Sequence, residues 1–464
     1  MKKIIALLLV LSTVFTMLVA CNEGPEEVMG SEDPYKNTDV VLKTENFSYS
    51  RGELSIAFSQ YFAEFTADKE TVDFYNIDLE ASLKDQIYDG EVTWFDNFAD
   101  MSIEYMTRVL YLCEGAKAAG VELSEEDLEQ IEDAVDSYVR YANDYGYSEQ
   151  EYFTLIFGSG VNQDILREYY KKDALAMRYE NQLVKSYEFS DKELEEAAKK
   201  ERNSFYTIDY LSFMFDEDED KGARAAAQDL AKITDAEEFK TFVNDYMVNT
   251  LLYKSEEVDG VKLSYEHKYY DEYSDFSKKA FAENAKAGLT HVKENEVDGQ
   301  YTVYLLTKAP TLREVLTKNV RMLAINTESH ETVAKAKAAA EELLQEWKDG
   351  KATEESFTEL IKEHSDNSVG KVNGGMYENL SAEDSYPQEL NEWLYSEDTK
   401  KGSTLIFKDE GFYYIAYFCS DGETKWKIDA KELLTNEKYT KEQEELSKKY
   451  TVEKFDEVIK SLDK

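Results

Sequence analysis

Few side chains in this sequence are spaced in a way that would support covalent or metal chemistry. The cysteines Cys21, Cys113 and Cys419 lie far apart and do not make a disulfide framework. The acidic run over residues 216–220 lacks the spaced ligands of a calcium loop and is predicted to be a solvated turn. No nucleophile elbow, Walker A or zinc-protease motif occurs, so we expect neither a metal nor a cofactor. The histidines also lack metal-ligand spacing; they are His267, His291, His330 and His364.

The chemistry that the sequence does support is alkylation of the Cys21 thiol. Two lysines precede an apolar run over residues 4–19, and the run ends in Leu18-Val19-Ala20-Cys21. Such a run is typical of a secretory signal and is short for a membrane span. Its end resembles the lipobox of bacterial lipoproteins, in which cleavage before the cysteine leaves a sulfur that carries diacylglycerol. The resemblance implies a signal peptide over residues 1–20 and a protein held by lipid on Cys21 at the extracytoplasmic face of the cell membrane.

The acidic composition narrows the classes of partner. The chain has 97 acidic and 53 basic residues, which gives a net charge of −44. That charge repels a phosphate backbone, so we expect no nucleic-acid partner. It also disfavours a direct hold on anionic lipid, which leaves the lipid on Cys21 as the expected membrane contact. The polar, acidic stretch over residues 21–39 cannot bury a core and is predicted to be a flexible tether.

The elements that follow the tether are predicted to be helical over residues 40–203. Capping boxes begin at Ser50, Ser148 and Ser190, with a close variant at Ser124, and each precedes an amphipathic stretch. A single buried helix face is indicated by the three-four spacing of Ile103, Met106, Val109, Leu110 and Cys113. A further helix is expected over residues 437–464, where one apolar face has no partner of its own and must dock elsewhere.

Two later segments, residues 204–310 and 315–426, have the pattern of two copies of one α+β unit. Ile208-Asp209-Tyr210-Leu211 in the first matches Val320-Arg321-Met322-Leu323 in the second. In each segment an Ala-rich helix, a second apolar helix and a late hairpin follow. The order strand, helix, helix, strand, strand predicts the same fold twice, and the alternative is two unrelated α+β domains.

The second unit contains a set of motifs in a fixed order: Val320 to Leu323, Phe357 to Asn367, Asn373-Gly374-Gly375, Lys401-Gly402-Ser403 and Gly411 to Ile415. Through these residues it resembles a parvulin, the small prolyl-isomerase domain. The first unit resembles the same family weakly, through its ends. The helical region resembles the chaperone part of SurA- and PrsA-type foldases, in which the last helix completes the cradle. The resemblance implies an α+β protein with a helical chaperone domain, residues 40–203 completed by 437–464, and two tandem parvulin-like domains.

Prolyl isomerisation requires no covalent step, because its barrier of ~18–20 kcal/mol comes from the partial double bond of the imide. A catalyst needs apolar walls and donors placed where the charge shifts. By match to the family, the polar floor would be Met322, Asn367 and Tyr413, where parvulins have a His, an Asp or Cys, and a His. The wall against a proline ring would be Tyr386 and Leu390. All three floor positions depart from the family, so we assign these five residues to substrate binding and none to catalysis.

The function that the resemblance implies is a membrane-anchored extracytoplasmic foldase that binds unfolded or partly folded exported proteins. One alternative is an active peptidyl-prolyl isomerase that works through Asn367 and Tyr413. A second is a lipoprotein that binds a specific solute or partner and shares only the architecture.

Overall fold

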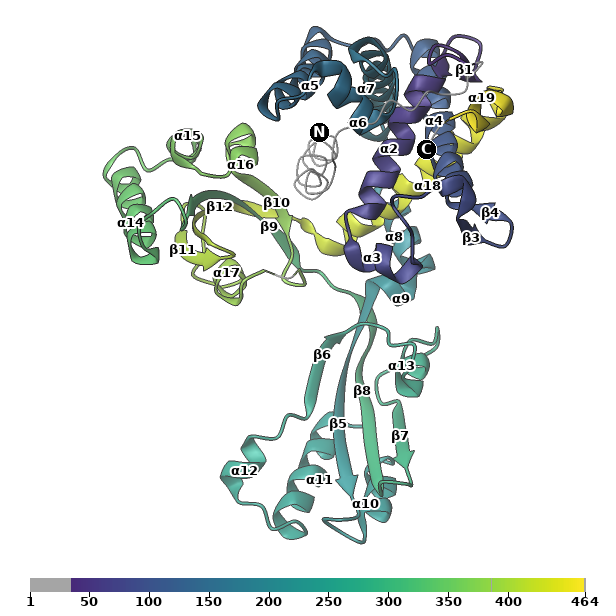
Figure 1. The fold of residues 1–464 in the computed structure, drawn as a ribbon. Helices are drawn as coiled ribbons and strands as arrows, with labels where there is room; N and C mark the ends of the chain where they lie inside the picture. Colours follow the sequence, from purple (N-terminus) through teal and green to yellow (C-terminus); the bar gives the residue numbers. More distant parts are fainter. Residues whose placement is uncertain (1–34, 385, 463–464) are drawn as a thin grey trace. The chain divides into compact units, whose positions relative to one another are not determined.

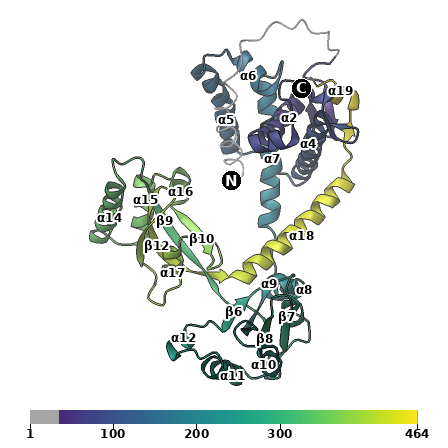
Figure 2. The same ribbon diagram turned by 60° about the horizontal axis from the view of Figure 1, so that its bottom comes forward.

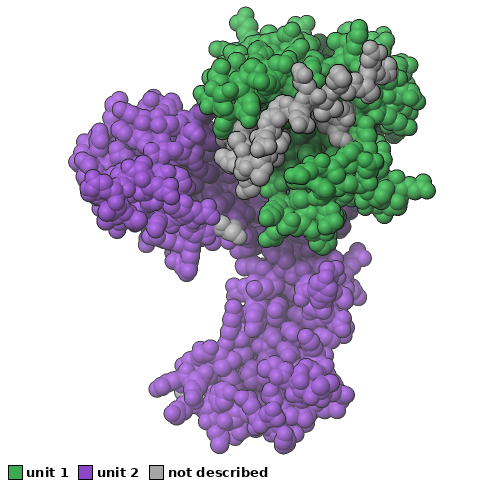
Figure 3. Space-filling model, viewed as in Figure 1, with its two compact units in different colours: residues 1–188, 435–464 green, residues 189–434 purple. Residues whose placement is uncertain are grey.

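The computed structural model describes residues 35–384 and 386–462. The expected signal peptide, Cys21 and most of the tether lie outside the described residues. Across these two ranges no helix is both long and apolar enough to cross a membrane. The chain divides into two compact units, shown in separate colours in Figure 3. Unit 1 combines Met1–Glu188 with Thr435–Lys464, and unit 2 is Phe189–Leu434.

Unit 1 is mainly helical, and its helices start where the capping pattern predicts. The boxes at Ser50, Ser124, Ser148 and Ser190 all form, the last of them at the start of unit 2. A short β-hairpin, residues 87–93, lies between the helices of residues 69–75 and 94–118 (Figure 1). The elements are β1 (Val40–Lys43), β2 (Ser48–Ser50), α2 (Arg51–Thr66), α3 (Lys69–Tyr75), η1 (Leu83–Asp85), β3 (Ile87–Asp89), β4 (Val92–Thr93), α4 (Trp94–Ala118), α5 (Glu125–Asp144), α6 (Glu149–Phe157) and α7 (Gln163–Lys185).

The core of unit 1 contains the helix face predicted from the sequence. Ile103, Met106, Val109, Leu110 and Cys113 are all buried in α4. Cys113 and Cys419 are both free and buried, as expected of core residues.

The end of the chain differs from the prediction of one helix over residues 437–464. Helix α18 (Lys425–Lys449) begins earlier and stops earlier, and Figure 2 shows it as one continuous helix. The chain then forms β13 (Glu453–Lys454), which pairs antiparallel with β1, and the short helix α19 (Asp456–Lys460). The apolar residues Val458, Ile459 and Leu462 are nevertheless buried in the core of unit 1. Strand pairing to β1 therefore interrupts the helical pattern without exposing its apolar face.

Unit 2 contains two α+β modules after the helices α8 (Asp191–Lys200) and α9 (Arg202–Phe205). The first module contains β5 (Tyr206–Asp216), α10 (Ala223–Leu230), α11 (Ala236–Asn249), α12 (Ser255–Asp259), β6 (Ser264–Lys268), α13 (Asp275–Ala280), β7 (Thr290–Asn295) and β8 (Gln300–Leu312). The second module contains β9 (Leu316–Asn326), α14 (Val333–Asp349), α15 (Glu354–His364), α16 (Ser368–Asn373), β10 (Met376–Leu380), α17 (Gln388–Leu394), β11 (Thr404–Asp409) and β12 (Phe412–Thr424).

The two modules have the same strand order. The first sheet runs β6-β5-β8-β7 and the second β10-β9-β12-β11, and every pair is antiparallel. The predicted match in strand order is therefore observed. The sequence pattern missed the edge strands β6 and β10 and the helices α13 and α17. These elements are five to seven residues long, too short for a clear periodicity.

The sheet of the second module has two different faces. Helices α14 and α15 cover one face, and their core includes Leu323, Ile325 and Ile415. Helix α17 covers part of the other face, whose core includes Met322, Leu390 and Phe418. Figure 1 shows the helices on opposite sides of the sheet. Because successive residues of a strand point to opposite faces, the sequence decides residue by residue which face each side chain serves.

Candidate functional site

The loop between α15 and α16 is fixed to β9 by the serine-acid pair of the sequence motif. Ser365 is fully buried, and its hydroxyl oxygen accepts from the backbone N–H of Ala324 at 3.2 Å. The Asp366 backbone N–H donates to the Ala324 carbonyl, and its carboxylate accepts from the Asn326 N–H at 2.7 Å. These bonds hold the next residue, Asn367, beside the central strand.

The glycine pair fixes the other side of β9. Gly374 and Gly375 both have positive φ, +63° and +69°, a conformation that costs glycine little. The Gly375 carbonyl accepts from the Met322 N–H at 2.8 Å. A Cβ on Gly375 would lie 2.6 Å from the Met322 carbonyl oxygen and 2.6 Å from Ile361 Cδ1. The close approach of this loop to Met322 therefore requires glycine.

Three of the five predicted site residues lie on the α17 face of the sheet. Met322 on β9 is buried, and Leu390 on α17 is buried in the same apolar cluster. Tyr386, just before α17, packs against that cluster, and its hydroxyl donates to Asp384 at 3.2 Å. We call the surface formed by Met322, Leu390, Tyr386, Tyr377 and Tyr414 the α17 face.

Tyr413 does not lie on the α17 face. It pairs with Ile325 across β12 and β9 and packs against the cluster under α14 and α15. The neighbouring Tyr414 pairs with Ala324 and packs against the Met322 cluster instead. Sequence matching chose the wrong one of two adjacent tyrosines for this face. The alternation of β12 could have revealed it, because Tyr414, Ala416 and Phe418 share a face and are each followed by a residue of the opposite face.

Asn367 serves first as a helix cap. Its side-chain oxygen accepts from the Gly370 N–H at 3.0 Å at the start of α16. That oxygen is consequently committed to the backbone, and Asn367 is half-buried at the end of the loop. Its position beside β9 is thus explained by local structure alone.

Two tyrosine hydroxyls offer donors on the α17 face. Tyr377 on β10 pairs with Val320, and Tyr414 on β12 pairs with Ala324, so the two flank Met322 on the central strand. Burial raises the pKa of both the Tyr377 and the Tyr414 phenols. The neighbouring Tyr377 raises the pKa of Tyr414 further. Both are therefore neutral O–H donors near pH 7. The arrangement offers partly buried rings for apolar contact and two hydroxyls that can donate to a carbonyl.

The equivalent face of the first module is more aromatic. Tyr210 stands at the position that matches Met322, and it packs edge-on to Phe276 of α13 with ring centroids 5.2 Å apart. Tyr304 stacks on Phe276 at 4.7 Å. His291 on β7 stacks on the same rings, and burial together with Lys279 lowers its pKa. This face is filled by its own rings.

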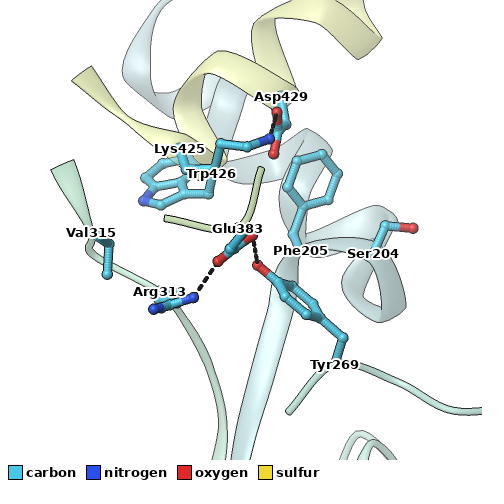
Figure 4. A pocket seen from close by; sticks show the side chains of 9 residues that line it. All are labelled: Ser204, Phe205, Tyr269, Arg313, Val315, Glu383, Lys425, Trp426 and Asp429. Carbon is cyan, nitrogen blue, oxygen red and sulfur yellow. Dashed lines mark hydrogen bonds and ion pairs between the residues drawn. The ribbon is translucent and has the colours of Figure 1, made fainter. Parts of the chain in front are cut away.

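A small pocket in unit 2 lies where the modules join α18 (Figure 4). Glu383 forms an ion pair with Arg313 and accepts from the Tyr269 hydroxyl at 2.7 Å. Trp426 and Asp429 line its other side. Glu383 thus binds both Arg313 and Tyr269, whereas Arg313 Nε is buried without a hydrogen-bond partner among the described residues. We assign the Arg313–Glu383–Tyr269 contacts to a structural tie.

The acidic run over residues 216–220 behaves as a turn. Asp216 ends β5 and accepts from the backbone of Asp218, while Asp220 accepts from Gly222. Tyrosine hydroxyls from neighbouring elements donate to Glu217 and Asp220. Within the described ranges no group of three or more His, Cys, Asp or Glu side chains could hold a metal ion.

Residues 304–419 match the family model described as a PPIC-type PPIASE domain, a span that ends on β12 of the second module. No curated protein matches the chain. A solved structure with similarity is the crystal structure of foldase protein PrsA from Streptococcus pneumoniae, at 14% identity over 50% of this chain and 80% of that one. Its TM-score is 0.16, too low to bear on the fold.

Proposed function

We propose that this protein is a membrane-anchored extracytoplasmic foldase. The match of residues 304–419 to the PPIC-type PPIASE family model, which agrees with the resemblance predicted from the sequence, supports the proposal. In this proposal residues 40–203 and 437–464 make the helical chaperone domain, and residues 204–310 and 315–426 make two parvulin-like domains. Its partners are unfolded or partly folded exported proteins.

One observation carries the proposal: the α17 face keeps an apolar wall while its floor has lost the family's ionisable groups. Leu390 and Met322 are 1% and 8% exposed and pack together with the ring of Tyr386. Holding an apolar or proline-containing segment needs accessible contact area, which the partly buried rings of Tyr386, Tyr377 and Tyr414 supply above this buried base. Met322 has no hydrogen to donate. Binding is therefore favoured over catalysis.

Weak isomerase activity is the second candidate, and the hydroxyls of Tyr377 and Tyr414 favour it. A donor accelerates the reaction only where it binds the transition state better than the ground state. Loss of one well-placed donor at an oxyanion site costs about 10²–10³ in rate. Two neutral phenols in place of coupled histidines would leave a slow enzyme at best.

Two assays on the same preparation separate these functions. The first follows aggregation of a chemically unfolded client protein, and we expect suppression at near-equimolar ratios. The second follows cis-to-trans return of an Xaa-Pro peptide, and we expect at most slight acceleration. Failure to suppress aggregation, with or without isomerase activity, would contradict the foldase proposal. Rapid isomerisation would instead show an active prolyl isomerase and would contradict the assignment of this face to binding alone.

The anchor is tested separately through Cys21→Ala. The motive is the box that ends in Ala20-Cys21, since only the thiol can accept the lipid. The variant should stay unprocessed or be released from membranes, whereas Cys113→Ala should still partition with them. A Cys21→Ala protein that remains with membranes after alkaline washing would show that lipid on this residue is not what holds it.

A further inference from the structure

The segment of unit 1 between α2 and α4 exposes an unusual number of large apolar side chains. Phe74 is 81% and Ile87 is 59% exposed. We call the set the hairpin patch; it consists of Phe74, Tyr75, Leu79, Ile87, Tyr88 and Val92, all among the exposed residues. Figure 1 shows β3 and β4 extending away from the helices of their unit. Exposed apolar groups gathered in one short segment indicate an interaction site.

The patch is displayed by a built support. Ile77 and Leu83 anchor the segment in the core of unit 1. The Gln86 side chain bridges the loop, because it accepts from the Asp78 N–H at 2.8 Å and donates to the Asp78 carbonyl at 2.9 Å. Buried Trp94 contacts the rings of both Tyr75 and Tyr88, at 5.4 and 4.7 Å between centroids. The aromatic part of the patch is thus held on a fixed base.

The charge around the patch is strongly negative. Residues 67–93 contain eight acidic side chains and two lysines. All eight carboxylates are exposed, and none forms an ion pair with any residue of the described ranges. Lys84 is occupied, since its Nζ donates to the Lys460 carbonyl at 3.1 Å and lies over the Phe95 ring. The carboxylates are Asp68, Glu70, Asp73, Asp78, Glu80, Asp85, Asp89 and Glu91.

An apolar surface in a segment rich in carboxylates that form no ion pair is complementary to one kind of ligand. We propose that the hairpin patch binds extended polypeptide segments in which Lys or Arg alternates with large apolar residues. The apolar side chains cover the exposed rings and aliphatic groups, and the cations meet the carboxylates. Complementary charge mainly raises the association rate and selects partners, while apolar burial supplies most of the hold. Anionic lipid has the wrong charge for this surface.

This inference rests on the proposed function and gives it a selectivity: among unfolded chains, the protein would capture cationic apolar segments first. The test uses the full mature chain and two fluorescent peptides, twice-repeated Lys-Phe-Ser-Lys-Leu-Ser and the same peptide with Glu for Lys. Fluorescence anisotropy should show at least tenfold tighter binding of the Lys peptide. The difference should shrink as salt rises, because the Debye length falls from about 10 Å at 0.1 M to about 3 Å at 1 M.

The decisive variant is Phe74→Ser with Ile87→Ser, which should weaken binding of the Lys peptide at least tenfold. Its matched control is Tyr273→Ser with Val297→Ser, which removes an aromatic and an aliphatic side chain that are 89% and 94% exposed in unit 2. The control should bind as the unsubstituted protein does. A variant with Asp73→Asn, Asp89→Asn and Glu91→Gln should keep its fold and lose most of the preference for Lys over Glu.

Several results would overturn the inference while leaving the foldase proposal standing. They are equal affinity for the two peptides, no binding of either, or unchanged affinity in the Phe74→Ser, Ile87→Ser protein, each accompanied by normal suppression of client aggregation. Binding of phosphatidylglycerol vesicles through Phe74 and Ile87 would also overturn it. Loss of aggregation suppression in the unsubstituted protein itself would contradict the proposed function.

Discussion

At the scale of the residue, the adjacent tyrosines of β12 make a matched pair. Tyr414 lies on the α17 face beside Met322, and Tyr413 lies under α14 and α15. If any isomerase activity is present, Tyr414→Phe should reduce kcat/KM at least tenfold, because it removes a hydrogen-bond donor of the α17 face and little volume. Tyr413→Phe should leave kcat/KM within a factor of two. The peptide assay described above measures both, and the opposite ranking would return the site to Tyr413.

A second residue-scale feature is a carboxyl enclosed by tyrosines in unit 1. Asp173 on α7 accepts from the Tyr49 hydroxyl at 3.5 Å and interacts with Tyr105 of α4. Burial raises the pKa of Asp173 to about 7, against the opposing effects of the tyrosine donors and of Lys172. Lys172 is itself paired with Glu53 at 2.6 Å. The folded protein consequently holds Asp173 protonated at pH values where the unfolded chain has it ionised.

The sign of the resulting pH effect follows from that raised pKa. The folded state binds the extra proton, so the contribution of Asp173 to stability declines as pH rises from about 4 to about 7 and is level above. Asp173→Asn removes the titration and keeps the shape. The variant should therefore gain stability over the unsubstituted protein across this window, by roughly 1–3 kcal/mol at pH 8. Urea unfolding of both proteins at pH 5 and pH 8 measures this difference in the free energy of unfolding. A difference that becomes smaller as pH rises would refute the raised pKa of Asp173.

Prediction of single residues from the sequence was correct where a pattern repeats over several turns. It failed where the face of a strand depends on a register of one residue. The buried face of α4, from Ile103 to Cys113, recurs over several turns, so a single misreading would not have changed it. The choice between Tyr413 and Tyr414 depends on strand register, and a shift of one residue exchanges the two faces. Tyr377 was missed because β10 is short and its pairing with Val320 is not local.

At the scale of the element, local chemistry predicted starts better than ends. The capping boxes at Ser50, Ser124 and Ser148 depend only on residues three positions apart, and each forms. The break of the last helix after Lys449 depends on β1, more than 400 positions earlier, which takes Lys454 opposite Leu42. No local signal reports such a partner, so the apolar pattern alone suggested a helix that continued.

The loop after α16 provides an element-scale prediction. Gly375→Ala should destabilise the second module by about 2 kcal/mol or more, because it combines positive φ with a clash against the Met322 carbonyl. The matched control is Gly402→Ala, where φ is +92° but the nearest atom is 4.0 Å away. Urea midpoints of the two variants separate the strain of the backbone from the contact. Equal losses would show that the approach to Met322 is not what requires glycine.

At the scale of the whole molecule, the sequence predicted a mixed α+β protein and the duplication of one strand order. The duplication was visible because Ile208 to Leu211 and Val320 to Leu323 lie within the corresponding central strands β5 and β9. The division into two units was harder to foresee. One boundary falls inside α18, between Leu434 and Thr435, and nothing in the composition of that helix marks the point.

The return of the chain to unit 1 gives a prediction for the truncated protein. Removal of residues 450–464 takes away Val458, Ile459 and Leu462 from the core and Ser461, which accepts from Arg51 at 2.7 and 2.9 Å. Unit 1 should lose on the order of 5 kcal/mol, since each buried aliphatic side chain contributes about 1.5–3 kcal/mol. Calorimetry should show a lower melting temperature for unit 1 and an unchanged melting temperature for unit 2. Val458→Ala should give a smaller shift in the same direction, and an unaltered first transition would refute the docking.

The pairing of Leu42 with Lys454 also dictates an order of events during synthesis. Unit 2 is complete once residue 434 has emerged, whereas unit 1 lacks β13 and α19 until residues 453–460 have emerged. Contacts this distant in sequence form slowly, because the chain loses the entropy of closing a long loop before the contacts stabilise it. The newborn chain therefore passes through a stage in which the inserted half is finished and the outer half is still open. During that interval, apolar residues of the unit 1 core are exposed to solvent, as they are in any incompletely folded protein.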